Sequence, residues 1–288
     1  MCEVTVNAAR INSNMQFHSE GGLELLSRLN EKPRSTNLDE VLFPDGINSK
    51  SIVEITGPSS TGKTVLLCQF IAKCILPARY KGIQIDGCDA CAILIDTLGH
   101  VQMSKVAELM TSMVCSAYRS AGVQAPAETV DMIVTGCLKN LTVIGCCNSD
   151  QFQLALHTLE DEFLCNERIT LLAIDNILAY YWQERREKGL FSMDQYTKTL
   201  VRIVQAQTCQ FSIVTAYTRW DGPSSESEVS VKHTENLLGR TDVNYRLRLC
   251  KNNVAREFMC HVESADDTKQ IRYTISDNGI KWTIFNSA

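Results

Sequence analysis

The chain has 288 residues, of which 44% are hydrophobic and 21% are charged, and its formal net charge is −5. This length and apolar content suffice for one large α/β domain with a full core. The negative charge argues against a protein that coats itself with nucleic acid through bulk charge, so any DNA contact must be local. The longest apolar run, residues 65–76, is interrupted by Gln69 and Lys73 and is too short for a membrane span.

Thirteen cysteines are scattered along the sequence, and several of them, such as Cys68, Cys74 and Cys115, lie inside apolar runs. Together with an N-terminus that does not resemble a secretory signal, this pattern is typical of buried thiols in a reducing compartment. Cys88 and Cys91 have the spacing of half a zinc or redox site, but no second pair follows at ribbon distance. Metal or redox chemistry is therefore the minor interpretation of this pair.

The first segments of the chain are polar. Residues 1–20 show no strong period and are expected to form an N-terminal arm, with a core domain over residues 21–288. Glycines followed by spaced leucines predict a short amphipathic helix over residues 21–29, and a polar loop follows it. The apolar, β-branched run at residues 52–56 predicts the first core strand.

The stretch that follows this strand matches the phosphate-loop pattern GxxxxGK[ST] at every fixed position. An apolar run with helical spacing comes next, so the order is strand, glycine loop, helix. Backbone N–H groups of such a loop and the positive end of the helix hold phosphates. The candidate nucleotide-binding residues are Gly57, Pro58, Ser59, Ser60, Thr61, Gly62, Lys63 and Thr64.

We expect Lys63 to reach the outer phosphates and the Thr64 hydroxyl to bind Mg²⁺. The predicted ligands are therefore ATP and Mg²⁺. The alternative is a glycine-rich turn that fits the pattern by chance.

Two later strands are predicted to end in an acid. The apolar run 92–96 ends in Asp96, and the run 171–175 ends in Asp175, which gives the Walker-B pattern of four hydrophobic residues followed by Asp. Acids at these positions lie at the carboxyl edge of a parallel sheet. Asp175 is thus the predicted second metal residue, acting on Mg²⁺ through water.

The other elements follow from periodicity. Helices are predicted over residues 103–118, 150–163 and 196–206, and strands over residues 141–144 and 211–216. Residues 77–89 are interpreted as a surface loop, and residues 221–239 as a long mobile loop. Alternating apolar residues within 245–249, 258–262 and 271–275 predict antiparallel strands.

Three stretches resemble the ATPase core of the RecA-like recombinases of eukaryotes and their paralogues. They are residues 52–97, residues 171–182 and residues 273–280. The second stretch contains Asp175 and ends in the sequence Ala-Tyr-Tyr-Trp. The resemblance as a whole covers roughly residues 17–282. The resemblance implies a RecA-like P-loop ATPase core, with a mostly parallel central sheet flanked by helices and C-terminal antiparallel strands. The separate N-terminal helical domain of the family is not expected here.

Two departures from the family pattern bear on activity. In active recombinases a glutamate after the Asp-Thr pair serves as general base, whereas this chain has Leu98, so no catalytic residue is assigned. Loss of a general base typically costs about 10²–10⁴-fold in rate. Asp96, which precedes this position, is the candidate accessory acid. The Asn-Gln pair that senses the terminal phosphate in the family is replaced by Ala216 and Tyr217.

The resemblance also locates two loops that line the DNA channel in recombinases, at about residues 183–193 and 219–240. Both loops mix cations with glutamates, which removes most of the advantage of counterion release. A solvated charged loop is an equally good interpretation. The candidate DNA contacts are Arg185, Arg186, Lys188, Lys232 and Arg240.

The function implied is an ATP-binding, weakly hydrolysing or non-hydrolysing subunit of a recombinase paralogue complex in homologous recombination repair of DNA double-strand breaks. The alternatives are an active DNA-dependent ATPase and strand-exchange recombinase, or a small-molecule kinase, for which the segment 221–239 supplies no arginine-bearing lid.

The family resemblance also gives expectations about partners and location. The expected partners are the D-type recombinase paralogue and the larger paralogue complex, with this chain as an end member. DNA is expected to be contacted through that complex, no membrane is involved, and the location is the nucleus with some protein in the cytoplasm.

Overall fold

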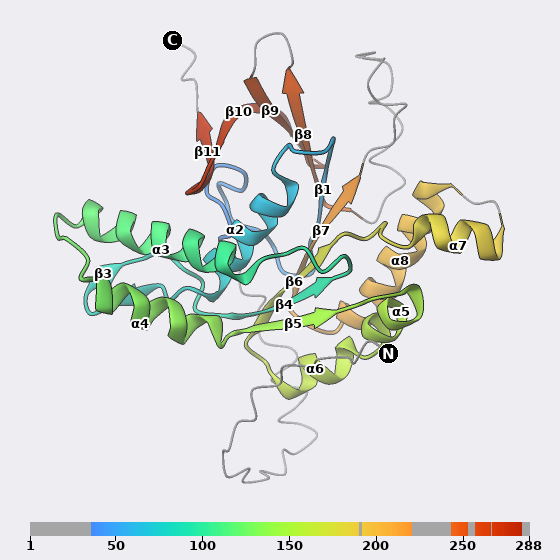
Figure 1. Cartoon of the computed structure of the whole chain (residues 1–288), viewed down its shortest axis with the longest axis horizontal. Coiled ribbons are helices and arrows are strands. Elements are labelled where there is room, and N and C mark those ends of the chain that lie inside the picture. Colours follow the sequence, from blue (N-terminus) through green and yellow to red (C-terminus); the bar gives the residue numbers. More distant parts are fainter. Residues whose placement is uncertain (1–35, 190–191, 221–242, 253–256, 266, 284–288) are drawn as a thin grey trace.

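The computed structural model describes residues 36–189, 192–220, 243–252, 257–265 and 267–283. The predicted N-terminal arm, the predicted helix at 21–29 and the predicted loop at 221–239 lie outside these residues. The centre of the molecule is a nine-stranded sheet with the strand order β11-β10-β9-β8-β1-β7-β6-β4-β5 (Figure 1).

Six neighbouring strands of this sheet, from β8 through β1, β7, β6 and β4 to β5, are parallel, and β8 to β11 continue it antiparallel. This arrangement confirms the predicted α/β class with C-terminal antiparallel strands. The strands of the sheet are β1 Ile52–Gly57, β4 Cys91–Asp96, β5 Leu141–Gly145, β6 Ile169–Asp175, β7 Val214–Trp220, β8 Tyr245–Asn252, β9 Glu257–Glu263, β10 Thr268–Ser276 and β11 Gly279–Thr283.

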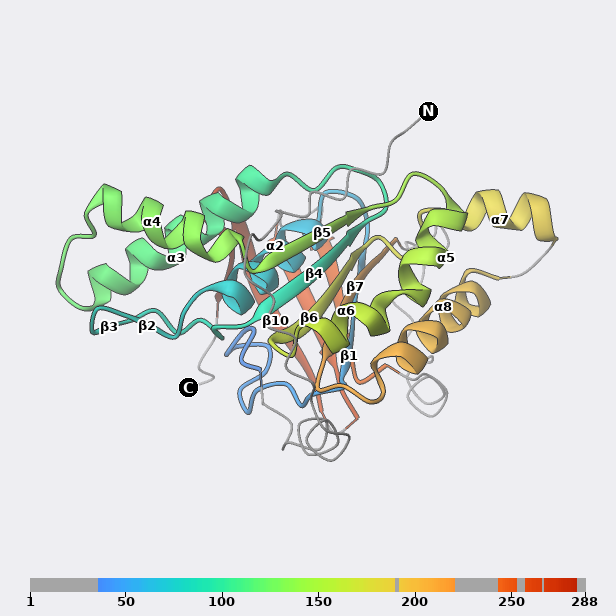
Figure 2. The same ribbon diagram turned by 90° about the horizontal axis from the view of Figure 1, so that it is seen from below.

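Helices cover both faces of the parallel part, so β1, β4 and β6 are buried along their whole length. One cluster of buried residues includes α2, α3 and α4, and the other includes α5, α6 and α8. Figure 2 shows these two groups of helices from below. The helices are α2 Lys63–Ile75, α3 Met103–Ser120, α4 Ala127–Leu138, α5 Ser149–His157, α6 Leu159–Cys165, α7 Tyr181–Lys188 and α8 Met193–Thr208. Among the described residues, none of the helices has the length and apolarity needed to cross a bilayer.

Two element predictions on the α5 side of the sheet have the right type but the wrong bounds. The helix predicted over residues 150–163 is divided into α5 and α6 at Thr158, whose hydroxyl lies 3.1 Å from the Leu154 carbonyl and 3.2 Å from the Ala155 carbonyl. A threonine that bonds the preceding turn competes with helix continuation. The strand predicted over 211–216 lies at 214–220, because Phe211 packs in the core outside the ladder and the strand continues through polar residues.

The predicted surface loop at 77–89 is also wrong in part. It contains the hairpin formed by β2 Arg79–Tyr80 and β3 Ile83–Gln84, and its end packs tightly on α2. A Cβ at Gly87 would lie 2.0 Å from the Leu76 carbonyl oxygen, so the glycine permits this close approach. Helix α4 was not predicted.

Helix α5 offers a matched test of the core. Leu156 is fully buried, whereas Leu154 on the same helix is 64% exposed. Leu156→Ala should lower the free energy of unfolding by about 3 kcal/mol through lost burial and a residual cavity. Leu154→Ala should change it by less than about 0.5 kcal/mol. Urea unfolding followed by circular dichroism measures both, and equal effects of the two substitutions would contradict the packing described here.

Candidate functional site

The phosphate-loop residues join β1 to α2 at the carboxyl edge of the sheet. Gly57 ends β1 with a φ of 145°, and a Cβ there would lie 2.2 Å from the Leu249 carbonyl oxygen, so only glycine fits. Gly62 is the N-cap of α2 with a φ of 90° and provides no side-chain cap. The N–H groups of the first helical turn, which have no intrahelical acceptor, therefore face the loop without a capping side chain.

Side chains within the loop tie it to itself and to the C-terminal strands. The Lys63 ammonium donates to the carbonyls of Gly57 and Pro58, at 2.7 Å each. The Thr61 hydroxyl donates to the Pro58 carbonyl at 2.9 Å, and the Tyr273 hydroxyl donates to the Thr61 carbonyl at 2.8 Å. Ser59 and Ser60 are exposed. The loop is thus held by its own side chains and by β10, and its two serines are exposed.

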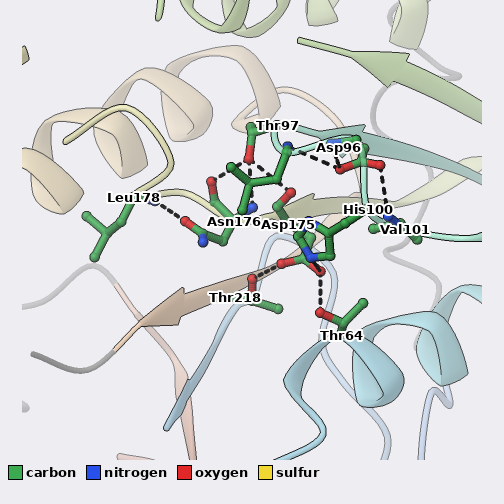
Figure 3. Close-up of polar contacts among 11 residues, drawn as sticks. Thr64, Asp96, Thr97, His100, Val101, Asp175, Asn176, Leu178 and Thr218 are labelled. Carbon is green, nitrogen blue, oxygen red and sulfur yellow. Dashed lines mark hydrogen bonds and ion pairs between the residues drawn. The ribbon is translucent and has the colours of Figure 1, made fainter. Parts of the chain in front are cut away.

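Asp175, at the end of β6, is the centre of the site (Figure 3). Its side chain is buried, and the Thr64 hydroxyl from α2 donates to Oδ2 at 2.6 Å. The Thr218 hydroxyl from β7 donates to Oδ1. His100 lies on the loop after β4, with Nε2 3.6 Å from Oδ2. The structure therefore brings together the predicted pair Thr64 and Asp175.

Sequence reasoning missed Thr218 and His100. Thr218 lies beyond the predicted end of its strand, and only the parallel ladder between β6 and β7 brings it to Asp175. The available signal for His100 was its position in the loop after an acid-ended strand, where ligand-binding side chains gather in parallel sheets.

These residues fit a magnesium nucleotide. Mg²⁺ binds hard oxygen ligands and is usually held by one or two carboxylates together with substrate phosphates. The Thr64 hydroxyl and the Asp175 carboxylate are such oxygens, and they lie beside the uncapped N-terminus of α2. Within the described ranges, no group of three or more His, Cys, Asp or Glu side chains is arranged to hold a metal ion.

Asp96, the predicted accessory acid, holds the loop that follows β4. Its Oδ1 accepts the N–H of Gly99 at 2.8 Å, and its Oδ2 accepts the N–H of Val101 at 3.1 Å. The Leu98 side chain is 53% exposed in the same loop. The Thr97 hydroxyl accepts the Asn176 N–H at 2.8 Å and so joins the loop to the end of β6. Both oxygens of the Asp96 carboxylate thus bond the backbone of this loop.

Tyr217 faces the opposite side of β7 from Thr218. It is 1% exposed, and its hydroxyl donates to Glu54 Oε2 at 2.9 Å. Burial raises the pKa of the Tyr217 phenol well above its usual value, and the neighbouring Glu54 carboxylate raises it further. Glu54 is also paired with Arg246, whose Nε lies 2.7 Å from Oε1. Tyr217 therefore belongs to a buried polar network that joins β1, β7 and β8.

The first predicted DNA loop, at 183–193, is wrong as a loop because most of its residues form α7 and the start of α8. Arg185 lies over the Trp182 ring at 5.4 Å, Lys188 pairs with Glu184 at 2.5 Å, and Arg186 is exposed. The second group of predicted contacts, Lys232 and Arg240, lies outside the described residues.

Glu184 anchors α7 to α5. The Ser149 hydroxyl donates to this buried carboxylate. Burial by itself would raise the pKa of Glu184, but the hydrogen bonds from Lys188 and Ser149 outweigh it and lower the pKa below its usual value. The carboxylate is thus kept ionised, and α7 is fixed by it.

The hydroxyl of Thr218 should matter for stability because it bonds a buried carboxylate. Thr218→Val keeps the side-chain shape and removes the donor, so we expect a loss of about 1–3 kcal/mol in the free energy of unfolding. Thr199→Val on α8 is the control, because that exposed hydroxyl bonds only a carbonyl of its own helix. A Thr218→Val variant as stable as the control in chemical denaturation would refute the contact.

Comparisons with known proteins agree with this site and fold. The model of the Rad51 family matches residues 29–281. The chain is 30% identical over 247 residues to the DNA repair protein XRCC2 of Mus musculus, which covers 81% of this chain and 80% of the mouse protein. It is 22% identical over 256 residues to the DNA repair protein XRCC2 homolog of Arabidopsis thaliana, covering 76% of this chain and 68% of the plant protein. The expected resemblance to RecA-like recombinases and their paralogues is thereby confirmed, and the chain belongs to the Rad51 family.

Proposed function

We propose that this chain is an ATP-binding subunit of a recombinase paralogue complex that supports homologous recombination repair of DNA double-strand breaks, with weak or no ATP hydrolysis of its own. The observation that carries the proposal is the 2.6 Å contact between Thr64 and Asp175, together with an exposed leucine, Leu98, in the loop after β4. The names of the mouse and plant relatives, both DNA repair proteins, support the repair role.

The proposed ligand is ATP with Mg²⁺. Residues 57–64 would hold the phosphates through backbone N–H groups and the Lys63 ammonium. Thr64 would bind the metal directly, and Asp175 would bind it through water. When bound, Mg²⁺ would neutralise phosphate charge.

Weak hydrolysis follows from the loop after β4. The Leu98 side chain has no atom that accepts a proton, and the Asp96 carboxylate bonds three backbone N–H groups of its own loop. A site that lacks a positioned base loses about 10²–10⁴-fold in rate. The recombinase alternative requires another acid at this position and is therefore the weaker candidate.

The proposed partners are the D-type recombinase paralogue and the larger paralogue complex, and the proposed location is the nucleus, where chromosomal DNA is repaired. DNA would be contacted through the complex. Arg185, Arg186 and Lys188 remain the candidate contacts among the described residues. Arg186 and Lys188 are exposed, whereas Arg185 is half-buried and lies over the Trp182 ring.

Removing the Lys63 ammonium tests nucleotide binding. Lys63→Ala should abolish labelling by a photoreactive ATP analogue, because it deletes the charge that reaches the outer phosphates. Lys139→Ala, an exposed lysine at the end of α4, is the matched control and should label like the wild type. Undiminished labelling of a folded Lys63→Ala variant would show that the phosphate loop no longer binds nucleotide.

Assembly is tested by native mass spectrometry of the protein alone and mixed with candidate recombinase paralogues. Sites of the RecA-like family are completed at subunit junctions, so a subunit without its own base is expected to work with a different chain. The expected result is a monomer that shifts to a one-to-one complex with the D-type paralogue. Extended homopolymers formed without a partner would contradict this expectation.

A further inference from the structure

His100 approaches the Asp175 carboxylate on a different element from Thr64. Its Nε2 lies 3.6 Å from Asp175 Oδ2, the same oxygen that accepts the Thr64 hydroxyl at 2.6 Å (Figure 3). Thr64 comes from α2, which follows β1, whereas His100 follows β4. In the sheet, β7 and β6 lie between β1 and β4, so the two side chains reach one carboxylate from opposite sides of the strand that carries it.

The backbone holds His100 in this position. The residues on either side of it, Gly99 and Val101, both donate their N–H groups to the Asp96 carboxylate. Gly99 has a φ of 65°, which a glycine adopts without strain and which turns the chain here. The Leu98 N–H also donates to this carboxylate, and the three hydrogen bonds fix the loop that carries the imidazole independently of the Asp175 contact.

The imidazole is able to donate to a ligand. At 3.6 Å, the distance from Nε2 to the carboxylate oxygen exceeds that of a hydrogen bond. The His100 side chain is 44% exposed, whereas the Asp175 side chain is 4% exposed. An N–H group at this place can therefore bond an oxygen that arrives beside Asp175 from solvent, which the neighbouring Leu98 side chain cannot do.

We propose that His100 recognises the terminal phosphate of a bound nucleoside triphosphate and makes the site select triphosphate over diphosphate. The inference rests on the proposed nucleotide binding. The phosphates would be held at the N-terminus of α2, and a phosphate oxygen that lies beside Asp175 would be within reach of the His100 imidazole, which is 3.6 Å from that carboxylate. A hydrogen bond to a charged phosphate oxygen is among the strong ones, so one donor suffices for measurable selectivity. His100 acts here as a specificity-determining residue and not as a proton acceptor.

Isothermal titration calorimetry with ATP–Mg²⁺ and with ADP–Mg²⁺ tests this inference on the full chain. The wild type should bind ATP more tightly than ADP. His100→Ala should weaken ATP binding about 10-fold or more, the value of a hydrogen bond to a charged group, and should leave ADP binding within about 2-fold. His100→Gln keeps an N–H donor and should recover part of the ATP affinity.

His157→Ala is the matched control, because His157 is exposed on α5, outside the site. Equal weakening of ATP and ADP by His100→Ala, or no weakening of either, would overturn the inference while leaving the proposed nucleotide binding intact. A wild type that binds neither nucleotide would overturn the proposed function and this inference with it. If His100→Ala fails to fold, His100→Gln decides alone, since loss of ATP preference despite the retained donor contradicts the inference.

Discussion

The pairing of the Asp175 carboxylate is the constraint on which the site and the parallel sheet both depend. The residue is 2% exposed, and a buried carboxylate is tolerated only when it is hydrogen-bonded or paired. Its partners are Thr64, Thr218 and His100, from α2, β7 and the loop after β4. They meet only if β1, β7, β6 and β4 are parallel and in register, because the carboxyl ends of such strands share one edge. The candidate site therefore forms only when the parallel sheet is assembled in this register.

Strand β7 also contributes to a second buried polar cluster, which lies on the other face of the sheet. Its alternation places Thr218 at Asp175 and Tyr217 at the buried Glu54, which Arg246 also pairs. Breaking a buried ion pair by removing one partner is strongly destabilising. Tyr217, which donates to Glu54, thus has a structural role on the face away from Asp175.

The C-terminal strands support the phosphate loop directly. The Tyr273 hydroxyl on β10 bonds the Thr61 carbonyl, and the β8 backbone at Leu249 approaches Gly57 closely. A tyrosine hydroxyl is protonated at neutral pH, and burial raises the pKa of the Tyr273 phenol further above its usual value. Strands β8 and β10 therefore help to fix the conformation of the phosphate loop.

The parts predicted from sequence are those with a local pattern. The phosphate loop needs fixed glycines within eight positions, and the acid-ended strands are continuous apolar runs, so both were found. Thr218 and His100 could not be found this way, because each meets Asp175 only through strand pairing distant in sequence. Helix α7 was taken for part of a loop because the family resemblance placed a DNA loop over residues 183–193, and the charged residues of this helix show no apolar period that would have indicated otherwise.

The most direct test of the account is to measure equilibrium ATP binding and steady-state ATP hydrolysis on one preparation, for the wild type and for Asp175→Ala. We expect Mg²⁺-dependent binding by the wild type that the substitution weakens, with a turnover number far below the usual enzyme range of about 1–10³ s⁻¹. A wild-type turnover within that range, lost in Asp175→Ala, would contradict the account and establish a working ATPase.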